Sequence, residues 1–303
     1  MADGRFAPSP TGSLHVGNLR TALLAWLFAR SDGGRFLVRV EDLDPVASRD
    51  ELVAEHLADL VALGLEHDGP IVRQSDPAVR ARHEEAIARL EAAGALYPCF
   101  CSRREIREAA QAAHGPLPEG AYPGTCRDLS ASDRAARALD RTPSLRVRAD
   151  GATVAVRDRL HGEHAGIVDD FVVRRGDGVP AYNLAVVVDD AHQGIAEVVR
   201  GVDLLEGTPR QAWLCDLLGL PRPRWVHVPL VLGPDGERLA KRHGSVTRTD
   251  LAAAAVDAPT LLGLMGQSLG LASARERTDA DTLLARFDPE AVPLEPWVFD
   301  APA

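Results

Sequence analysis

The residues best suited to chemistry lie close together near the start of the chain, between Arg5 and Asn18. Arg5, the hydroxyl of Ser9 and the imidazole of His15 are spaced around a turn rich in proline and glycine. An imidazole beside a helix N-terminus can donate to a phosphate in a transition state, and the free helix amides also favour anionic oxygen. Gly17 would let a base or ribose lie against the backbone. These residue types predict phosphate activation, although a histidine at a helix start can also serve only to cap or pack the helix.

The elements that must position these residues form a strand, a loop and a helix. Residues 5–7 can end a short strand, and an apolar-periodic helix opens at His15. After a glycine pair, residues 35–42 read as a second parallel strand, at the spacing of about one βαβ unit. Open α/β sheets bind ligands at the carboxyl ends of their strands, and a polar loop is the alternative. The carboxylates that would lie at this end are Glu41, Asp42 and Asp44.

Two further candidates lie in predicted strands of the second half. Residues 179–190 are apolar enough to form a buried sheet strand that carries Tyr182, by default a core aromatic with a satisfied hydroxyl. A strand over 195–201 has Arg200 at its tip, where a surface cation is the simplest interpretation. Arg5 and Arg200 each end a predicted core strand, however. A planar, permanently charged guanidinium can be buried there against a carboxylate.

Three of the four cysteines fall within 28 residues, at Cys99, Cys101 and Cys126. Thiolates at this spacing suit a tetrahedral zinc site, and three small buried hydrophobes are the alternative. His114 is chemically the ready fourth ligand, whereas Tyr122 would have to lose a proton whose ordinary pKa is near 10. A closed site of this kind would be structural, because no ligand position is left open for catalysis.

A basic loop follows a predicted hairpin turn over residues 233–245. Such a loop can fold over ATP and place the ammonium group of Lys241 on the triphosphate, where negative charge moves towards pyrophosphate. A charged loop after a turn can also simply be solvated.

Composition limits the classes of function. The chain has 303 residues, 46% of them hydrophobic, which fits an ordinary globular protein. Its 34 basic and 44 acidic residues give a formal charge of −10, which argues against non-specific coating of nucleic acid but allows one RNA docked on a local patch. No apolar run approaches the ~18 residues of a membrane span, and no signal peptide precedes the motif. We therefore expect a cytoplasmic protein with no membrane contact.

The two motifs together resemble class I aminoacyl-tRNA synthetases. The first resembles the HIGH signature, with Asn18 as its fourth letter, and its lead-in from Arg5 to Gly12 resembles the glutamyl branch. The second resembles a degenerate KMSKS loop, in which Lys241 alone matches at the central cation. The departures in that loop are Arg238, Leu239, Ala240 and Arg242.

This resemblance implies an α/β fold with a Rossmann-type nucleotide-binding catalytic domain and a parallel sheet. Residues 1–95 and 181–245 would be the two halves of that domain. Residues 96–180 would be an inserted zinc-containing, acceptor-like subdomain, and 246–303 a C-terminal helical region that contacts the RNA stem.

The resemblance also implies a role for each candidate residue. The implied catalytic residues are His15 and Lys241, which bind ATP together with Gly17 and Asn18. The implied glutamate-binding residues are Arg5, Ala7, Ser9, Glu41, Tyr182 and Arg200. The implied ligands of one structural Zn²⁺ are Cys99, Cys101, Tyr122 and Cys126, with His114 as the alternative to the tyrosine.

The implied reaction is attack of L-glutamate on ATP bound with Mg²⁺, without tRNA, followed by transfer of the glutamyl group to RNA. Only about 60 residues follow Lys241, too few for an anticodon-binding domain. That length and the cysteine pattern resemble the glutamyl-Q tRNA(Asp) synthetase family, which glutamylates queuosine in the tRNA(Asp) anticodon stem-loop. We expect a monomer. A truncated enzyme that charges tRNA(Glu), or a catalytically silent paralogue that binds amino acid or RNA, remains an alternative.

Overall fold

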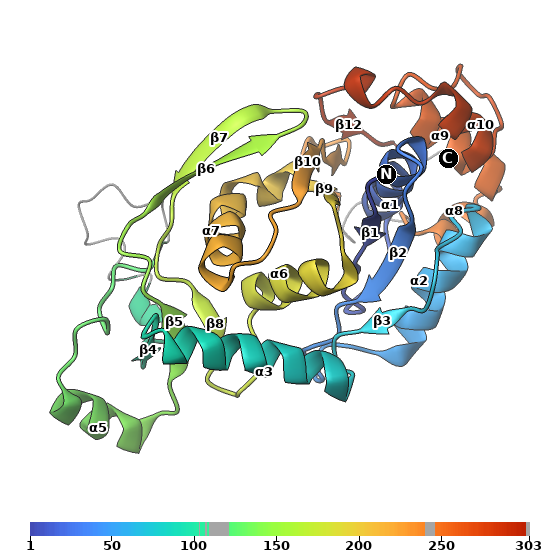
Figure 1. Ribbon diagram of the computed structural model, residues 1–303. Coiled ribbons are helices and arrows are strands. Elements are labelled where there is room, and N and C mark those ends of the chain that lie inside the picture. Colours follow the sequence, from blue (N-terminus) through green and yellow to red (C-terminus); the bar gives the residue numbers. More distant parts are fainter. Residues whose placement is uncertain (103, 107, 109–120, 240–245, 301–303) are drawn as a thin grey trace.

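A mostly parallel sheet forms the centre of the molecule, in a computed structural model that describes residues 1–102, 104–106, 108, 121–239 and 246–300 (Figure 1). Its strand order is β3-β2-β1-β9-β10-β6-β7, and every neighbouring pair is parallel except the β6–β7 hairpin. The predicted α/β class with a parallel sheet is therefore confirmed. The strands are β1 (Gly4–Phe6), β2 (Phe36–Val40), β3 (Val72–Arg73), β6 (Thr153–Asp158), β7 (Gly162–Ile167), β9 (Glu197–Gly201) and β10 (Arg224–Val228).

The first unit of the sheet is β1, helix α1 (Val16–Ser31) and β2, as the sequence predicts. Every residue of β1 and β2 is buried, which is typical of parallel strands covered on both faces. Helix α1 is apolar around most of its circumference and packs on β1, β2 and β9. It ends where Gly33 takes a φ of +68°, a conformation that glycine adopts without steric cost.

The second half of the sheet corrects one prediction. Residues 179–190 do not form a strand, because Tyr182–Gln193 is helix α6, which Gly194 ends with a φ of +68°. A short apolar run cannot by itself distinguish a buried strand from a buried helix. Tyr182 consequently lies in the first turn of a helix, with 44% of its surface exposed, and not in the core. The chain continues through β9, the 3₁₀ turn η1 (Val202–Gly207) and α7 (Thr208–Leu218) into β10.

The last part of the chain packs into the hydrophobic core beside the central sheet. Leu261, Met265 and Leu283 are fully buried in one hydrophobic cluster with α1, and Figure 1 shows their helices beside it. The C-terminal elements are α8 (Arg248–Ala253), α9 (Ala258–Gln267), α10 (Ala280–Arg286), η3 (Pro289–Ala291) and β12 (Trp297–Val298), which pairs with β11 (Val231–Leu232). Helices α2 (Asp50–Ala62) and α3 (Pro77–Ala92) complete the body. In the described part of the chain, no helix is both long and apolar enough to cross a membrane.

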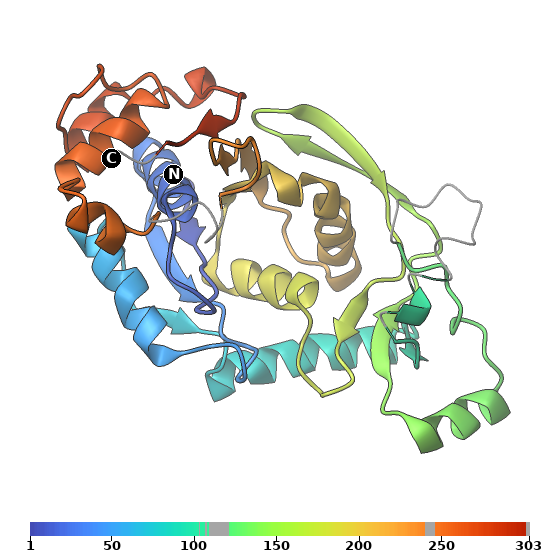
Figure 2. The ribbon, with the colours of Figure 1, turned by 180° about the vertical axis from the view of Figure 1, so that it is seen from behind.

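A smaller antiparallel sheet lies at one end of the molecule. It is made of β4 (Leu96–Cys99), β5 (Ser144–Val147) and β8 (Val172–Arg174), in the order β4-β5-β8. The view from behind shows α5 (Ala131–Asp140) standing away from the body, in agreement with its lack of any buried residue (Figure 2). The cysteine-rich segment belongs to this end.

Candidate active site

A cleft of about 430 Å³ opens where the chain leaves β1, β2 and β9 at their carboxyl ends. This is the usual ligand position in an open α/β sheet, and the volume suits a small ligand. Nine of the residues that the sequence singles out line it: Arg5, Ala7, Ser9, His15, Gly17, Asn18, Glu41, Tyr182 and Arg200. A backbone bond from the Glu41 amide to the Pro8 carbonyl oxygen, 3.0 Å long, joins the loops that follow β1 and β2.

His15 caps helix α1 and lines the cleft at the same time. Its Nδ1 accepts the backbone N–H of Asn18 at 3.3 Å, and the Asn18 side-chain oxygen accepts the His15 N–H at 3.2 Å. The ring folds back over Gly17, where an added Cβ would lie only 2.9 Å from ring atoms. Because Nδ1 accepts, the neutral ring carries its proton on Nε2 and can donate it to a ligand. Burial and the nearby Arg238 guanidinium lower the pKa of His15, which favours this neutral form.

Arg5 and Glu41 belong to a buried charge network. Arg5 holds both carboxylate oxygens of Asp190, at 3.1 and 3.2 Å. Arg39, which has no exposed surface, donates to Asp190 at 2.7 Å and to Glu41 at 3.2 Å, and its Nε lies 3.9 Å from Asp189. The charge of Arg5 is thus already matched by a carboxylate of the protein.

The network sets the protonation of its carboxylates. Burial raises the pKa of Glu41, although Arg39 and Arg5 oppose the shift. Burial would also raise the pKa of Asp190, but the same two guanidinium groups hold it below its ordinary value. Asp190 is therefore the firmly ionised member.

Arg200 is buried, and among the described residues no carboxylate is in contact with it. Its Nε donates to His227, one terminal nitrogen to Gln211 and the other to Thr208, at 3.0, 2.7 and 2.8 Å. Two of its five N–H groups remain for Tyr182, which interacts with it, and for a ligand in the cleft. Burial and the nearby Arg5 lower the pKa of Arg200, and Tyr182 and Asp190 oppose this shift only in part. Arg200 is therefore the group in this cleft best prepared to take an anion.

The other predicted ATP contact, Lys241, lies outside the described residues. The described part of its loop reaches the cleft through Arg238 and Leu239. Arg238 pairs with Asp203 of η1 at 3.1 Å, so this loop and the turn after β9 meet at the same opening.

A second group of predicted residues lies in the small sheet and its neighbouring loops. The Sγ atoms of Cys99, Cys101 and Cys126 all lie within 4.8 Å of one another, with 3.5 Å between the last two. The Tyr122 hydroxyl is 3.4 Å from the Cys99 sulfur and 3.8 Å from that of Cys101, and it accepts the Cys126 N–H at 2.7 Å. His114 lies outside the described residues.

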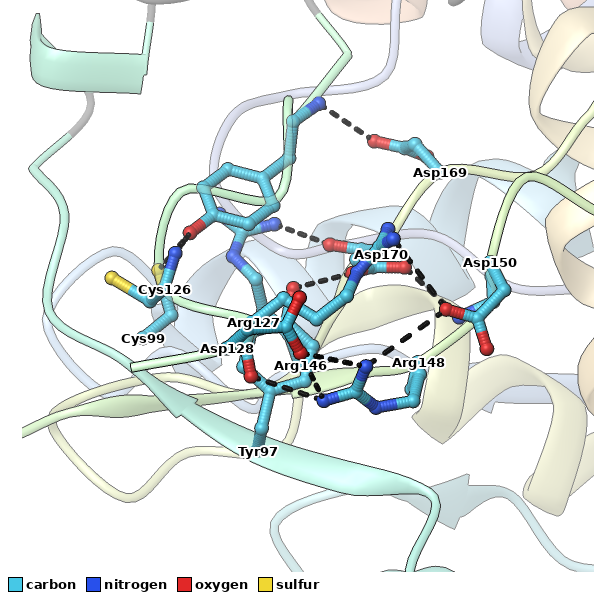
Figure 3. A network of polar contacts seen from close by, with 12 residues as sticks. Tyr97, Cys99, Cys126, Arg127, Asp128, Arg146, Arg148, Asp150, Asp169 and Asp170 are labelled. Atoms are coloured by element: carbon cyan, nitrogen blue, oxygen red, sulfur yellow. Dashed lines mark hydrogen bonds and ion pairs between the residues drawn. The ribbon is translucent and has the colours of Figure 1, made fainter. Parts of the chain in front are cut away.

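Charged residues contact the residues of this cluster and its neighbours (Figure 3). The guanidinium of Arg146 lies 3.8 Å from the centre of the Tyr122 ring, and Asp169 accepts the Tyr122 N–H. Asp170 accepts the Tyr97 hydroxyl at 2.5 Å and pairs with Arg127 at 2.7 Å.

The donor set fits a tetrahedral zinc ion. Ligand sulfurs in such a site lie about 3.8 Å apart when the Zn–S bonds are about 2.3 Å long, close to the separations in the cluster. Burial and the neighbouring Cys99 thiol raise the pKa of Cys101, and burial raises that of Tyr122. A metal would therefore have to displace protons on binding.

Several residues of the site were not among those singled out from the sequence. Arg39 and Asp190 carry the charge network, and Asp158 and His227 lie behind Arg200. A signal was present for Arg39, because a charged residue between Val38 and Val40 in a fully buried strand needs partners. Residues 158–164 are polar and carry no comparable signal.

Comparison with known proteins places the whole chain within one family. Residues 2–302 match the family model of the catalytic domain of class I tRNA synthetases (E and Q). A glutamyl-Q tRNA(Asp) synthetase of Nocardia farcinica is 59% identical over 97% of this chain and 92% of its own length. One of Symbiobacterium thermophilum is 48% identical over 98% and 95%. The crystal structure of the glutamate-tRNA synthetase of Elizabethkingia anophelis aligns with a TM-score of 0.84 and 25% identity, over 99% of this chain and 68% of that one.

Proposed function

The chain belongs to the class I tRNA synthetase catalytic-domain family of the glutamyl and glutaminyl type, and we propose that it activates L-glutamate with ATP and transfers the glutamyl group to the queuosine of tRNA(Asp). The observation that carries the proposal is the cleft in which a buried, unmatched Arg200 and the His15 imidazole open on one cavity. One group suits a carboxylate side chain and the other a phosphate.

Glutamate recognition follows from the charges of the cleft. The γ-carboxylate binds the N–H of Arg200 that its contacts with His227, Gln211, Thr208 and Tyr182 leave open, and Arg5 supports it while remaining paired with Asp190. Glu41 and Tyr182 hold the α-ammonium group. Ala7 and Ser9 add backbone and hydroxyl contacts from the loop after β1.

The activation step needs no group other than these residues and Mg-ATP. The glutamate α-carboxylate attacks the α-phosphate, so that an acyl–phosphate bond forms and pyrophosphate leaves. His15 donates its Nε2–H to the phosphate, and the Lys241 ammonium stabilises the charge that moves towards pyrophosphate. Gly17 and Asn18 hold the nucleotide at the start of α1. The adenylate forms without tRNA.

The choice of RNA acceptor rests on the relatives, which are named glutamyl-Q tRNA(Asp) synthetases. In this proposal a hydroxyl of queuosine, in the anticodon stem-loop, attacks the adenylate carbonyl and releases AMP. ATP and tRNA(Asp) are cytoplasmic, so the enzyme works there.

The test is transfer of labelled glutamate to purified tRNA(Asp) with and without queuosine, and to tRNA(Glu). Label only on queuosine-containing tRNA(Asp) is expected. Label on tRNA(Glu) would make the protein a charging enzyme, and label on no RNA would favour a silent paralogue.

Replacement of His15 by Asn is expected to separate its two roles, which are to cap helix α1 and to donate a hydrogen bond to a ligand in the cleft. Asn at the cap can still accept the Asn18 N–H, so the free energy of unfolding should change by less than about 0.5 kcal/mol. Without an imidazole N–H, glutamate-dependent ATP–pyrophosphate exchange should fall about 100-fold in kcat. His15→Ala is the control and should lose about 1 kcal/mol of stability as well. Unchanged exchange in the Asn variant would show that His15 only caps the helix.

Zinc is held in this proposal by Cys99, Cys101, Cys126 and Tyr122, as one structural ion. Tyr122→Phe removes only the hydroxyl and should weaken zinc binding at least about tenfold, because even loss of a group that only orients a metal ligand commonly costs that much. Cys101→Ser is the matched control and should lower the zinc content per chain. Competition with a chromophoric chelator measures both. Unchanged affinity in Tyr122→Phe would exclude the tyrosine and point to another ligand such as His114.

A further inference from the structure

Arg200 is held in place by a second layer of residues that reaches across the sheet. His227 in β10 is the register partner of Arg200 in β9, and the two strands are parallel neighbours. Arg200 Nε donates to His227 Nε2 at 3.0 Å, and on the other side of the ring His227 Nδ1 lies 2.7 Å from Asp158. Asp158, His227 and Arg200 thus form a linear chain of contacts from β6 through β10 to the cleft.

The hydrogen bonds around Asp158 decide which atoms donate and which accept in this row of contacts. One Asp158 oxygen accepts the backbone N–H groups of Leu160 and His161, at 3.0 and 2.9 Å. The other oxygen accepts the backbone N–H of His227 at 3.0 Å, and it is also the oxygen that contacts the His227 imidazole. Burial opposes ionisation of Asp158, but His227 and these amides hold its pKa below the ordinary value. An ionised Asp158 can only accept, so His227 carries its proton on Nδ1.

The state of Nε2 follows from the same reasoning. The Nε of Arg200 can only donate, so His227 must present a lone pair at Nε2. A proton at that position would place two donors 3.0 Å apart and put a second cation beside Arg200. Neither His227 nor Asp158 lines the cleft, so neither touches a bound ligand.

We propose that His227 is a positioning residue for glutamate recognition: Asp158 fixes its Nδ1–H tautomer, and its Nε2 lone pair aims the Arg200 guanidinium at the γ-carboxylate. The inference rests on the proposed function, because it takes Arg200 as the partner of that carboxylate. It predicts that glutamate affinity depends on the protonation of a residue outside the binding surface.

The pH dependence has a definite sign. The charged or titratable groups that face His227 are Asp158, His161 and Arg200, and beyond Arg200 lie Arg5, Asp190 and Tyr182. Burial, Arg200 and His161 lower the pKa of His227, and Asp158 opposes them, so the ring is neutral at pH 7. KM for glutamate should be flat near pH 7 to 8 and rise as pH falls through a value below 6.5, the ordinary histidine pKa.

The kinetic test compares two replacements in the full chain. His227→Phe keeps a ring but removes the acceptor, and should raise KM for glutamate about 10- to 100-fold, with KM for ATP unchanged and kcat within about threefold. His227→Gln offers an oxygen near the Nε2 position and cannot titrate. It should restore most of the affinity and remove the rise of KM at low pH. Equal KM in the Phe variant and the wild type, or equal defects in both variants, would overturn the proposal.

A second measurement does not depend on activity. In protein labelled with ¹⁵N-histidine, the two-bond ¹H–¹⁵N spectrum should show a protonated Nδ1 and an unprotonated Nε2 for the signal that His227→Gln removes. A protonated Nε2 at pH 7.5 would overturn the proposal even if the Phe variant failed to fold. Absence of glutamate-dependent exchange in the wild-type protein would instead overturn the proposed function, and the spectrum would still decide the tautomer.

Discussion

Replacement of Arg200 by Leu is expected to reduce kcat/KM for glutamate activation by roughly 30- to 3,000-fold while leaving the fold intact. Removal of one member of a buried, hydrogen-bonded charge pair costs about 2–5 kcal/mol of binding free energy, and each 1.4 kcal/mol is about a factor of ten. In the proposed function the pair is formed with the substrate, because Arg200 contacts no carboxylate in the described part of the chain. ATP–pyrophosphate exchange across a range of glutamate concentrations measures the loss.

The stability of the same variant is the discriminating readout. Burial lowers the pKa of Arg200, so the folded protein disfavours its charge, and the loss on replacement comes from the buried acceptors of His227 and Gln211, which no longer have this donor. The free energy of unfolding should therefore fall by about 1–3 kcal/mol, less than for loss of a protein–protein ion pair. Arg200→Lys is the matched control. It keeps a cation but loses the planar fork, so it should recover only part of the affinity. A large loss of stability in Arg200→Leu, or normal exchange, would contradict the assignment of Arg200 to the substrate.

Arg39→Met is expected to affect mainly stability, in contrast to Arg200→Leu. The free energy of unfolding should fall by about 3–5 kcal/mol. Arg39 is fully buried and faces Asp190, Glu41 and Asp189, which would be left close together without this cation. Arg5 would still pair with Asp190, and His83 would still contact Asp189. Urea unfolding monitored by fluorescence at pH 7.5 measures the loss. Arg35→Met is the matched control. It removes an exposed arginine from its pair with Asp3 and should leave stability nearly unchanged.

The pH dependence of Arg39→Met supplies a further check. In the wild type the pKa of Asp190 is below its unfolded value, so its stabilisation is present above that unfolded value and is lost on acidification. Without Arg39 the buried carboxylates should have raised pKa values, which penalise the folded state most at high pH. The difference in stability between variant and wild type should therefore shrink as pH falls from 8 towards 5. A difference that grows over this range would show that Arg39 acts by packing and not by charge.

The sequence predicted the part of the site that depends on local order. The strand, loop and helix from Arg5 to Asn18 follow one another directly in the sequence. Their arrangement can therefore be predicted from the turn-forming residues and the periodicity of the helix alone. The same holds for Glu41, because a carboxylate directly after a parallel strand must lie at the ligand edge of the sheet. These residues line one cleft in the structure.

The remainder depends on contacts between distant residues. Asp190 lies 151 residues from Arg39 and 185 from Arg5, and His227 meets an aspartate 69 residues earlier. No spacing rule indicates such pairs. The wrong strand over 179–190 shows the same limit, since its apolar run satisfied both a strand and a buried helix until tertiary packing was known.

The pairing of β11 with β12 has a consequence for the order in which the protein becomes active during synthesis. Val231 of β11 lines the cleft, and its strand partner in the described chain is Trp297. The ribosome makes that partner some 65 residues after β11, or about 3 to 13 s later at ordinary elongation rates. One wall of the cleft is thus completed only after the ribosome has made Trp297. A nascent chain that already displays the whole first motif should not yet consume ATP.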